Sequence, residues 1–353
     1  MSLFNRNHKS VLSIDISTVA VKLLEMSKTG NRYKIESFTS IPFFQSPSPE
    51  TNIANANVIA EALEIAFTRS QSKLKQATVA VSGSAVITKI FTMPASLTEE
   101  EIEGQIMIEA DQYVPYSLDE LNYDFEVQGA NINNHEMVDV LFVASRRENV
   151  DERVEALAKA GLKANIVDVE TFAMENAFSL LPDYSSQSLA SQTVAVADIG
   201  ATLSNLTVFH KGRAIYTREQ EFGGKQLTEE IQHRYGLSFE EAELKKIQGG
   251  LPENYLIDVL EPFKRAMVQQ IQRSLQFFIS SNTNRDINCL VLAGGCASIN
   301  NVDKLIEHNL RVPVYIANPL LNLSLSNKIK PETLYNIAPA LMIVCGLALR
   351  SFD

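Results

Sequence analysis

The chain has 353 residues, a formal net charge of −11 at pH 7 and a pI near 5.1. This length exceeds the usual size of a single hydrophobic core, so we expect two domains or one bilobed unit. The negative charge opposes general affinity for phosphate backbones and anionic lipid, which argues against a nucleic-acid-binding protein. The three cysteines have no paired spacing and give no complete disulfide framework, which fits a reducing cytoplasm.

The first ten residues are polar where a secretory signal peptide carries its apolar segment, so we expect no secretion signal. The longest apolar stretch, residues 337–349, is well short of the roughly 20 residues that span a bilayer. It is typical of a buried helix. We therefore expect a cytoplasmic protein that does not insert directly into a membrane.

The first part of the chain predicts a sheet with one helix. Apolar and β-branched runs predict strands at 11–16, 20–26, 33–41, 77–81 and 86–91. A Pro/Ser-rich loop at 43–51 and a helical pattern at 56–70 lie between the third and fourth of these strands.

The pattern changes between residues 93 and 161. A helix begins here with a capping box of Ser96 and Glu99, and it is followed by strands at 121–128 and 137–145. A second helix ends at Gly161. This helix, hairpin and helix unit is expected to be an insertion.

The second half repeats the opening arrangement of strand, turn and strand. After a strand and helix at 163–181 and a surface connection at 182–192, strands are predicted at 194–198, 203–210 and 213–220. Helices follow at 224–237, 238–249 and 254–281, then a buried strand at 287–295 and a closing helix at 338–350.

One short pattern occurs in both halves. "IDIST" begins at Ile14 and "ADIGAT" at Ala197, each at the end of an apolar strand and before a second strand. Small residues in such a turn let backbone N–H groups approach a phosphate, and the aspartate can hold a hydrated divalent cation. A single copy is also an ordinary turn, because Asp and small residues favour turns. Two copies suggest duplicated lobes that hold a nucleotide's phosphates between them.

Further segments carry a family resemblance. "EFGGKQLTEE" and "LAGGCASIN" add Gly pairs at a helix start and after a strand, and "VDVETFAMENA" and "APALMIVCGLALR" resemble two connecting helices. With the two turns, they resemble the actin, sugar kinase and heat-shock chaperone ATPase superfamily. The insertion resembles that of FtsA-type bacterial actin homologues. "FTMPASLTEEEIEGQIMIEADQYVPYSLDELNYDFEV" and "FGGKQLTEEI" bring the resemblance closer to the PilM family of type IV pilus assembly, over residues 11–350.

The resemblance implies an α/β, actin-like (ribonuclease H-like) duplicated two-lobe fold with an inserted FtsA-type α+β subdomain. The ranges that it implies are a first lobe at 9–92 and 162–192, an insertion at 93–161 and a second lobe at 193–353, whose smaller subdomain covers about 222–285.

The family implies a function that composition does not show. Its members bind ATP in the cleft between the lobes and capture an N-terminal cytoplasmic peptide of PilN in a groove that involves the first lobe and the insertion. We expect ATP and Mg²⁺ as cofactors, PilN as direct partner, PilO as indirect partner, and the motor ATPases and platform protein as further contacts. The protein would then lie peripherally at the inner membrane. The sequence leaves self-association and ATP hydrolysis open.

The resemblance also assigns the site. Asp15 and Asp198 would position Mg²⁺ through water. The phosphate and nucleoside contacts would come from the two turns, the second strand and three segments of the second half: Ser17, Thr18, Lys22, Gly200, Ala201, Thr202, Gly223, Gly224, Lys225, Glu241, Lys245, Gly294 and Gly295.

Several of these residues have a second interpretation. Ser17 stands where the family usually has glycine, so it either narrows access to the phosphates or donates its hydroxyl. Lys22 also fits a solvated strand lysine. Glu241 and Lys245, four residues apart, also fit a surface salt bridge. No hydrolytic base emerges, because Asp168 and Glu170 fit helix-capping positions as well as a water-orienting role. The five histidines are scattered and indicate no zinc site.

Two other functions compete with this one. A small-molecule kinase of the same fold needs a base near its acceptor hydroxyl, and the sequence offers no clear one. An FtsA-like cell-division protein attaches to membrane through an amphipathic C-terminal helix, and we expect no room for such a segment after "GLALRSFD".

Overall fold

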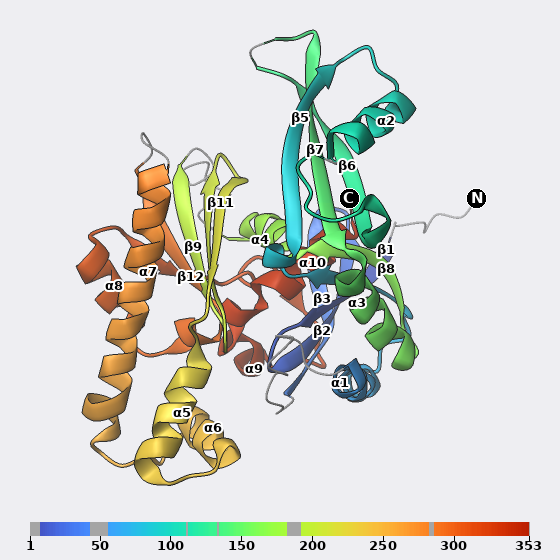
Figure 1. Ribbon diagram of the computed structural model, residues 1–353. Helices are drawn as coiled ribbons and strands as arrows, with labels where there is room; N and C mark the ends of the chain where they lie inside the picture. The colour runs from blue at the N-terminus through green and yellow to red at the C-terminus, as the bar shows by residue number, and fades with distance from the viewer. Residues whose placement is uncertain are drawn as a thin grey trace.

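The computed structural model of the chain describes residues 8–42, 56–110, 112–132, 134–181, 192–281 and 286–352. Two lobes lie side by side, and a smaller subdomain projects from the first of them (Figure 1). The expected connections at 43–51 and 182–191 lie outside the described residues.

The first lobe is built on a six-stranded sheet with the order β14-β3-β2-β1-β4-β8. The chain enters as an antiparallel meander of three strands and then adds β4 and β8 in parallel. The strands are β1 (His8–Ile16), β2 (Ala20–Thr29), β3 (Arg32–Pro42), β4 (Gln76–Val81), β8 (Lys163–Val169) and β14 (Ser324–Leu325).

The second lobe repeats this topology in a five-stranded sheet with the order β11-β10-β9-β12-β13. A three-stranded meander is again followed by parallel strands. The strands are β9 (Thr193–Ile199), β10 (Ser204–His210), β11 (Arg213–Gln220), β12 (Cys289–Ala293) and β13 (Val314–Ile316). The predicted duplication of strand, turn and strand is confirmed.

Helices cover both sheets. Helices α1 (Ala56–Ser70) and α3 (Arg147–Lys159) share an apolar core with the first sheet. The second lobe carries α5 (Gly224–Tyr235), α6 (Phe239–Gln248), α7 (Glu261–Ser281) and α8 (Val302–Leu310). Helices α4 (Glu170–Phe178) and α10 (Met342–Arg350) pack on each other and join the lobes (Figure 1). The short α9 (Pro331–Tyr335) and single turns at Gly83–Ala85 (η1), Leu118–Glu120 (η2), Leu256–Leu260 (η3), Gly295–Ser298 (η4) and Ala338–Leu341 (η5) complete the elements.

The C-terminal part of the chain returns to the first lobe. Strand β14 pairs in parallel with β3, and α10 shares an apolar core with β1, β2 and β3. We expected residues 193–353 to belong to the second lobe. The end of that range packs against the first lobe instead. The reason is that α10 is apolar nearly all around and is covered from both sides.

The inserted subdomain is a three-stranded antiparallel sheet, β5-β7-β6, with α2 (Glu99–Ala110) packed on one face. Its strands are β5 (Val86–Pro94), β6 (Leu121–Ala130) and β7 (Met137–Arg146). We expected the insertion to begin at residue 93, but β5 pairs with β7 along its whole length, so its sheet begins at Val86.

The helix of this subdomain also begins later than predicted. The capping box consists of Thr98 and Glu101, whose side chains each bind the other residue's backbone N–H, at 3.3 and 2.8 Å. The predicted pair Ser96 and Glu99 has the same spacing in the sequence. The observed capping box begins two residues after the predicted one, and Ile102 and Ile106 of α2 lie in the apolar core that the helix shares with the sheet.

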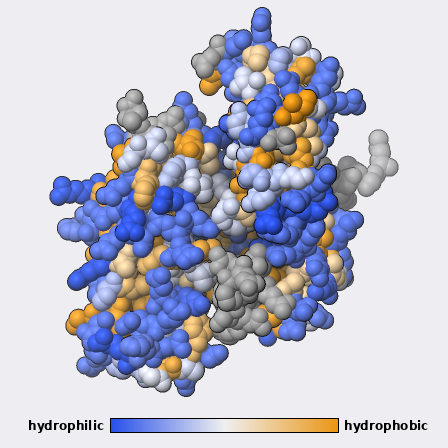
Figure 2. Space-filling view, viewed as in Figure 1, coloured by the Kyte–Doolittle hydropathy of each residue, from blue (hydrophilic) through white to orange (hydrophobic). Residues whose placement is uncertain are grey.

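Most residues on the face shown in Figure 2 are hydrophilic, and hydrophobic residues gather on the inserted subdomain. Within the described part of the chain, no helix combines the length and hydropathy needed to cross a bilayer. The three cysteines are buried, and none of them forms a disulfide.

Candidate functional site

The two repeated turns meet between the lobes. The first joins β1 to β2 and the second joins β9 to β10. The hydroxyl of Thr202 donates a hydrogen bond to the hydroxyl of Thr18 over 2.9 Å. The two expected phosphate-binding turns therefore face each other directly.

Asp15 and Lys22 form an ion pair at the base of the first turn. They are opposite each other on β1 and β2, and the Lys22 ammonium lies 2.7 Å from a carboxylate oxygen of Asp15. Their side chains are 6% and 17% exposed, so the interpretation of Lys22 as a solvated strand lysine is wrong. Burial opposes the lysine charge, but the charge and hydrogen bond of Asp15, together with the charges of Asp198 and Glu170, outweigh it, so the pKa of Lys22 is raised. Lys22 is thus held charged inside the cleft.

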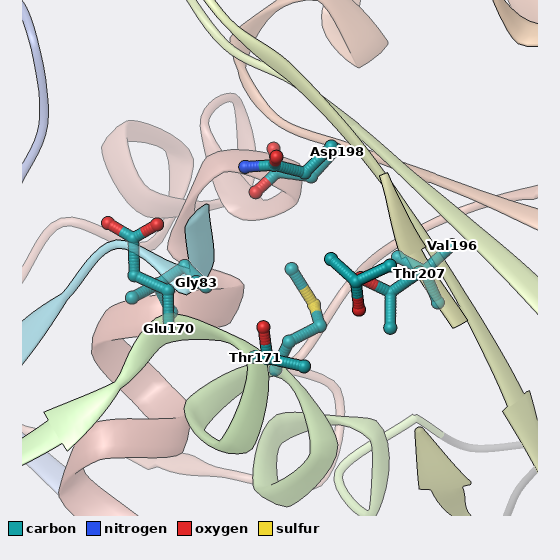
Figure 3. Close-up of a pocket in the computed structure, with 10 residues that line it drawn as sticks. Gly83, Glu170, Thr171, Val196, Asp198 and Thr207 are labelled. Carbon is teal, nitrogen blue, oxygen red and sulfur yellow. The ribbon is translucent and has the colours of Figure 1, made fainter. Parts of the chain in front are cut away.

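Two further carboxyl groups line a pocket between the lobes. Glu170 reaches it from the start of α4 and Asp198 from the end of β9 (Figure 3). Burial, Asp15 and Asp198 raise the pKa of Glu170 to about 8. Burial raises the pKa of Asp198 to about 6, although Lys22 opposes the shift. Two buried carboxyl groups therefore line one pocket, and each raises the cost of ionising its neighbours, which favours their protonated forms.

Asp168 and Glu170 have different surroundings, although the sequence treated them as a pair. Asp168 accepts the backbone N–H of Val169 at 2.8 Å and lies 3.9 Å from the guanidinium of Arg350, at the end of α10. The residue before α4, Val169, makes no side-chain cap. Only Glu170 therefore faces the pocket, and it does not cap its helix.

The start of α5 is docked on the second turn. The backbone N–H of Gly224 donates to the carbonyl of Gly200 over 3.0 Å, and that of Lys225 to the carbonyl of Ala201 over 2.7 Å. A Cβ atom at Gly223 would overlap the carbonyl of Ala201, so only glycine permits this approach. These N–H groups hold the turn in place. The Lys225 ammonium points to Glu229, 3.8 Å away.

Gly294 and Gly295 follow β12 and have different roles. Gly294 has φ +83°, and a Cβ atom there would lie 2.5 Å from Oδ1 of Asp198. At Gly295, a Cβ atom would meet no other atom within 4 Å. The first glycine lets the chain pass Asp198, and the second borders open space.

Helix α6 presents a different pair of residues from the predicted one. The carboxylate of Glu241 accepts the backbone N–H of Ser238 over 2.9 Å, as part of the capping box at the exposed start of α6. That hydrogen bond lowers the pKa of Glu241. Glu241 therefore lies at the exposed start of α6, and Lys245 is half-buried on the same helix.

Lys246 and Glu243 are the residues of α6 that reach the start of α5. The Lys246 ammonium binds Glu243 at 2.6 Å, the hydroxyl of Thr228 at 2.7 Å and the carbonyl of Gly224 at 3.3 Å. A Cβ atom at Gly224 would lie 3.2 Å from Sγ of Cys296. The sequence analysis missed this cluster. Its signal was the i, i+3 spacing of Glu243 and Lys246, which lie two positions after Glu241 and one position after Lys245.

A match to a known family decides the identification. The family described as type IV pilus assembly protein PilM matches residues 13–352. The chain belongs to the PilM family. The predicted resemblance is therefore confirmed over nearly the whole length, and neither a kinase nor an FtsA-like cell-division protein is favoured.

Solved structures agree with this assignment. This PilM-family chain is 26% identical to a chain of a "PilM-PilN type IV pilus biogenesis complex", with a TM-score of 0.79, over 97% of this chain and 98% of that one. The ethanolamine utilization protein EutJ from Carboxydothermus hydrogenoformans is 16% identical, with a TM-score of 0.57, over 97% and 89%. A diol dehydratase-reactivating factor in nucleotide-free form is 10% identical, with a TM-score of 0.55, over 97% and 99%. The last two share the fold alone, and the predicted actin-like α/β fold is confirmed.

Proposed function

We propose that this PilM-family protein is an ATP-binding scaffold that captures the N-terminal cytoplasmic peptide of a PilN-type inner-membrane protein. The observation that carries the proposal is the family match over residues 13–352. The 26% identity to the chain from a PilM–PilN complex extends over 97% of this chain, so both lobes and the insertion have counterparts there.

The cleft supports the nucleotide part of the proposal. Asp15, Lys22 and Asp198 converge beside the two turns, and Gly295 leaves space at the end of β12. Among the described residues, no group of three or more acidic, histidine or cysteine side chains is arranged to hold a metal directly. Asp15 and Asp198 would then hold Mg²⁺ through water, which suits an ion that keeps several waters and binds phosphates. Bound Mg²⁺ would neutralise phosphate charge.

We further propose that the protein binds ATP but turns it over weakly at most. With a pKa of about 8, Glu170 is largely protonated at neutral pH and makes a poor base for an attacking water. The protein would lie in the cytoplasm at the inner membrane through its partner. PilO would be reached indirectly, and the motor ATPases and platform protein would be further contacts.

The nucleotide site is tested with Asp198→Ala. Removing a carboxylate that positions the metal should weaken binding of ATP with Mg²⁺ by about tenfold or more, measured by calorimetric titration. Asp119→Ala changes an exposed aspartate of the inserted subdomain and should leave ATP affinity unchanged. Wild-type ATP affinity in Asp198→Ala would sink the site assignment.

The partner is tested separately. A synthetic N-terminal peptide of the PilN-type protein should bind in the same calorimeter, whereas a scrambled peptide of equal composition should not. We expect the groove between the first lobe and the insertion to hold it. Titrations with and without ATP and Mg²⁺ measure the coupling between the two ligands. No heat of binding from the authentic peptide would refute the partner assignment.

A further inference from the structure

A buried arginine of α3 points to a role that the sequence analysis missed. Arg153 is 7% exposed, and its Nε donates a hydrogen bond to the carbonyl of Ala80 at the long distance of 3.4 Å. Its Nη1 is buried and has no hydrogen-bond partner among the described residues. A buried guanidinium in this condition keeps strong donors unsatisfied.

The guanidinium lies at the end of the first sheet that faces the cleft. Ala80 is near the end of β4, opposite Asp168 on β8, and β4 is also the neighbour of β1 at the end that carries Asp15. Burial lowers the pKa of Arg153, and the carboxylates of Glu170, Glu152 and Asp15 oppose that shift. Arg153 is therefore a cation close to the acidic pocket, held by a carbonyl and by no ion pair within the ion-pair distance of 4 Å among the described residues.

The free donors have a chemical preference. A guanidinium presents a planar fork of N–H groups that matches the oxygens of a phosphate and binds it with two hydrogen bonds. Glu170, the acid of the pocket to which it is most strongly coupled, is largely protonated at neutral pH and offers little competition. An anionic phosphate entering the cleft would supply the acceptors that Arg153 lacks.

We propose that Arg153 contacts the terminal phosphate of a bound nucleoside triphosphate and transmits the effect of its binding to the inserted subdomain. The proposal rests on the proposed nucleotide binding and adds to it a residue outside the two turns, together with a route to the insertion.

Helix α3 is suited to this role by its position. It follows directly after β7, whose last residue is Arg146, and its apolar face packs in the core of the first lobe. One turn before Arg153, the amide of Asn149 donates to the hydroxyl of Ser145 over 3.3 Å, and that hydroxyl donates to the carbonyl of Ala85 over 2.8 Å. These contacts tie α3 to the base of the inserted sheet, so a shift of Arg153 toward phosphate would be transmitted there.

The test compares ATP with ADP in the full chain. Arg153→Met keeps an unbranched apolar stem and removes the guanidinium with its charge. We expect ATP affinity to fall by about tenfold or more, because a charged hydrogen bond is lost, and ADP affinity to change less than about twofold. Arg147→Met changes an exposed arginine of the same helix and should alter neither affinity. Arg153→Lys keeps a charge without the fork and should lie between.

A second readout follows the route to the insertion. In wild type, ATP but not ADP should slow hydrogen exchange of backbone amides at the junction of β7 and α3, and Arg153→Met should abolish the difference. If Arg153→Met does not fold, the same comparisons with Arg153→Lys decide.

The outcomes separate this proposal from the nucleotide function. If wild type binds ATP and ADP and the Arg153 variants keep its preference, only the Arg153 assignment is wrong. An equal loss for ATP and ADP would also overturn it, because the contact would not be to the terminal phosphate. If wild type binds neither nucleotide, both proposals fall together.

Discussion

The hydroxyl of Ser17 is used entirely within its own turn. It accepts the backbone N–H groups of Ala20 and Val19 at 3.1 and 3.4 Å, and it donates to the carbonyl of Ala20 over 3.0 Å. Serine favours such turns because its hydroxyl replaces a backbone partner. Of the two interpretations of Ser17, donation of the hydroxyl to a phosphate would therefore cost the hydrogen bond to the carbonyl of Ala20.

Ser17→Gly should lower the free energy of unfolding by about 1 kcal/mol, because it removes the hydrogen bonds and frees the backbone. Denaturant titration measures this change, and Ser96→Gly in an exposed loop serves as the matched control. We expect single-turnover ATP hydrolysis to stay at the wild-type rate. A faster rate in Ser17→Gly would contradict us and show that the serine limits turnover.

Glu170 makes stability depend on pH. Its pKa is about 8 in the folded protein, compared with 4.5 for an ordinary glutamate in water, which stands for the unfolded state. Between these values the folded state binds more protons than the unfolded state, so the contribution of Glu170 to stability is full below pH 4.5 and is lost as the pH rises through 8.

Glu170→Gln cannot ionise and should escape this loss. We expect it to exceed wild type in unfolding free energy by about 2 kcal/mol at pH 9, with the advantage shrinking toward pH 4.5. Denaturant titrations across this range, without Mg²⁺, measure the difference. Glu64→Gln, an exposed change on α1, should follow the wild-type curve. A Glu170→Gln curve parallel to wild type would show that Glu170 is already ionised.

At the scale of elements, the crossing of α4 and α10 depends on one glycine. A Cβ atom at Gly346 would overlap the carbonyl of Ala173, so the two helices pack with their backbones in contact. Both helices join the lobes, and their apolar residues enter the cores on either side. The distance between these helices is thus set by the absence of a side chain.

Gly346→Ala should destabilise the protein by about 1–3 kcal/mol, because the helices must separate to admit a methyl group. Gly104→Ala is the matched control: this glycine of α2 has no atom within 4 Å of its Cβ position. It should stabilise by about 0.5–1 kcal/mol, since alanine favours a helix. Denaturation midpoints measure both changes. Equal effects from the two substitutions would refute the close crossing.

Element types were predictable, but their partners were not. The runs at 77–81 and 86–91 were recognised as strands from their apolar and β-branched residues. The sequence does not tell which sheet each strand joins, because hydrogen-bond partners lie far along the chain. Strand β5 therefore fell on the wrong side of the predicted boundary, and the two-residue β14 gave no periodic signal.

At the scale of the whole molecule, a few polar contacts connect the lobes. Thr18 meets Thr202 at 2.9 Å, and the hydroxyl of Ser82 donates to Glu219 over 3.3 Å. Asp15 and Lys22 belong to the first lobe and Asp198 to the second; both carboxylates act to raise the pKa of Lys22, and Lys22 opposes the raised pKa of Asp198. A ligand between the turns would act on all of these groups at once, which connects the site to the arrangement of the lobes.

The sequence by itself determined the duplication, the two turns and the family, because these depend on local patterns that are written twice or along the whole chain. Asp15, Asp198 and Gly294 were predicted as site residues in this way. Tertiary structure alone decided that Glu170 enters the pocket while Asp168 does not, that Lys246 contacts the start of α5, and that Arg153 is buried beside the end of β4. The physical reason is that side-chain direction and burial depend on packing between distant segments, and no spacing in one sequence records that packing.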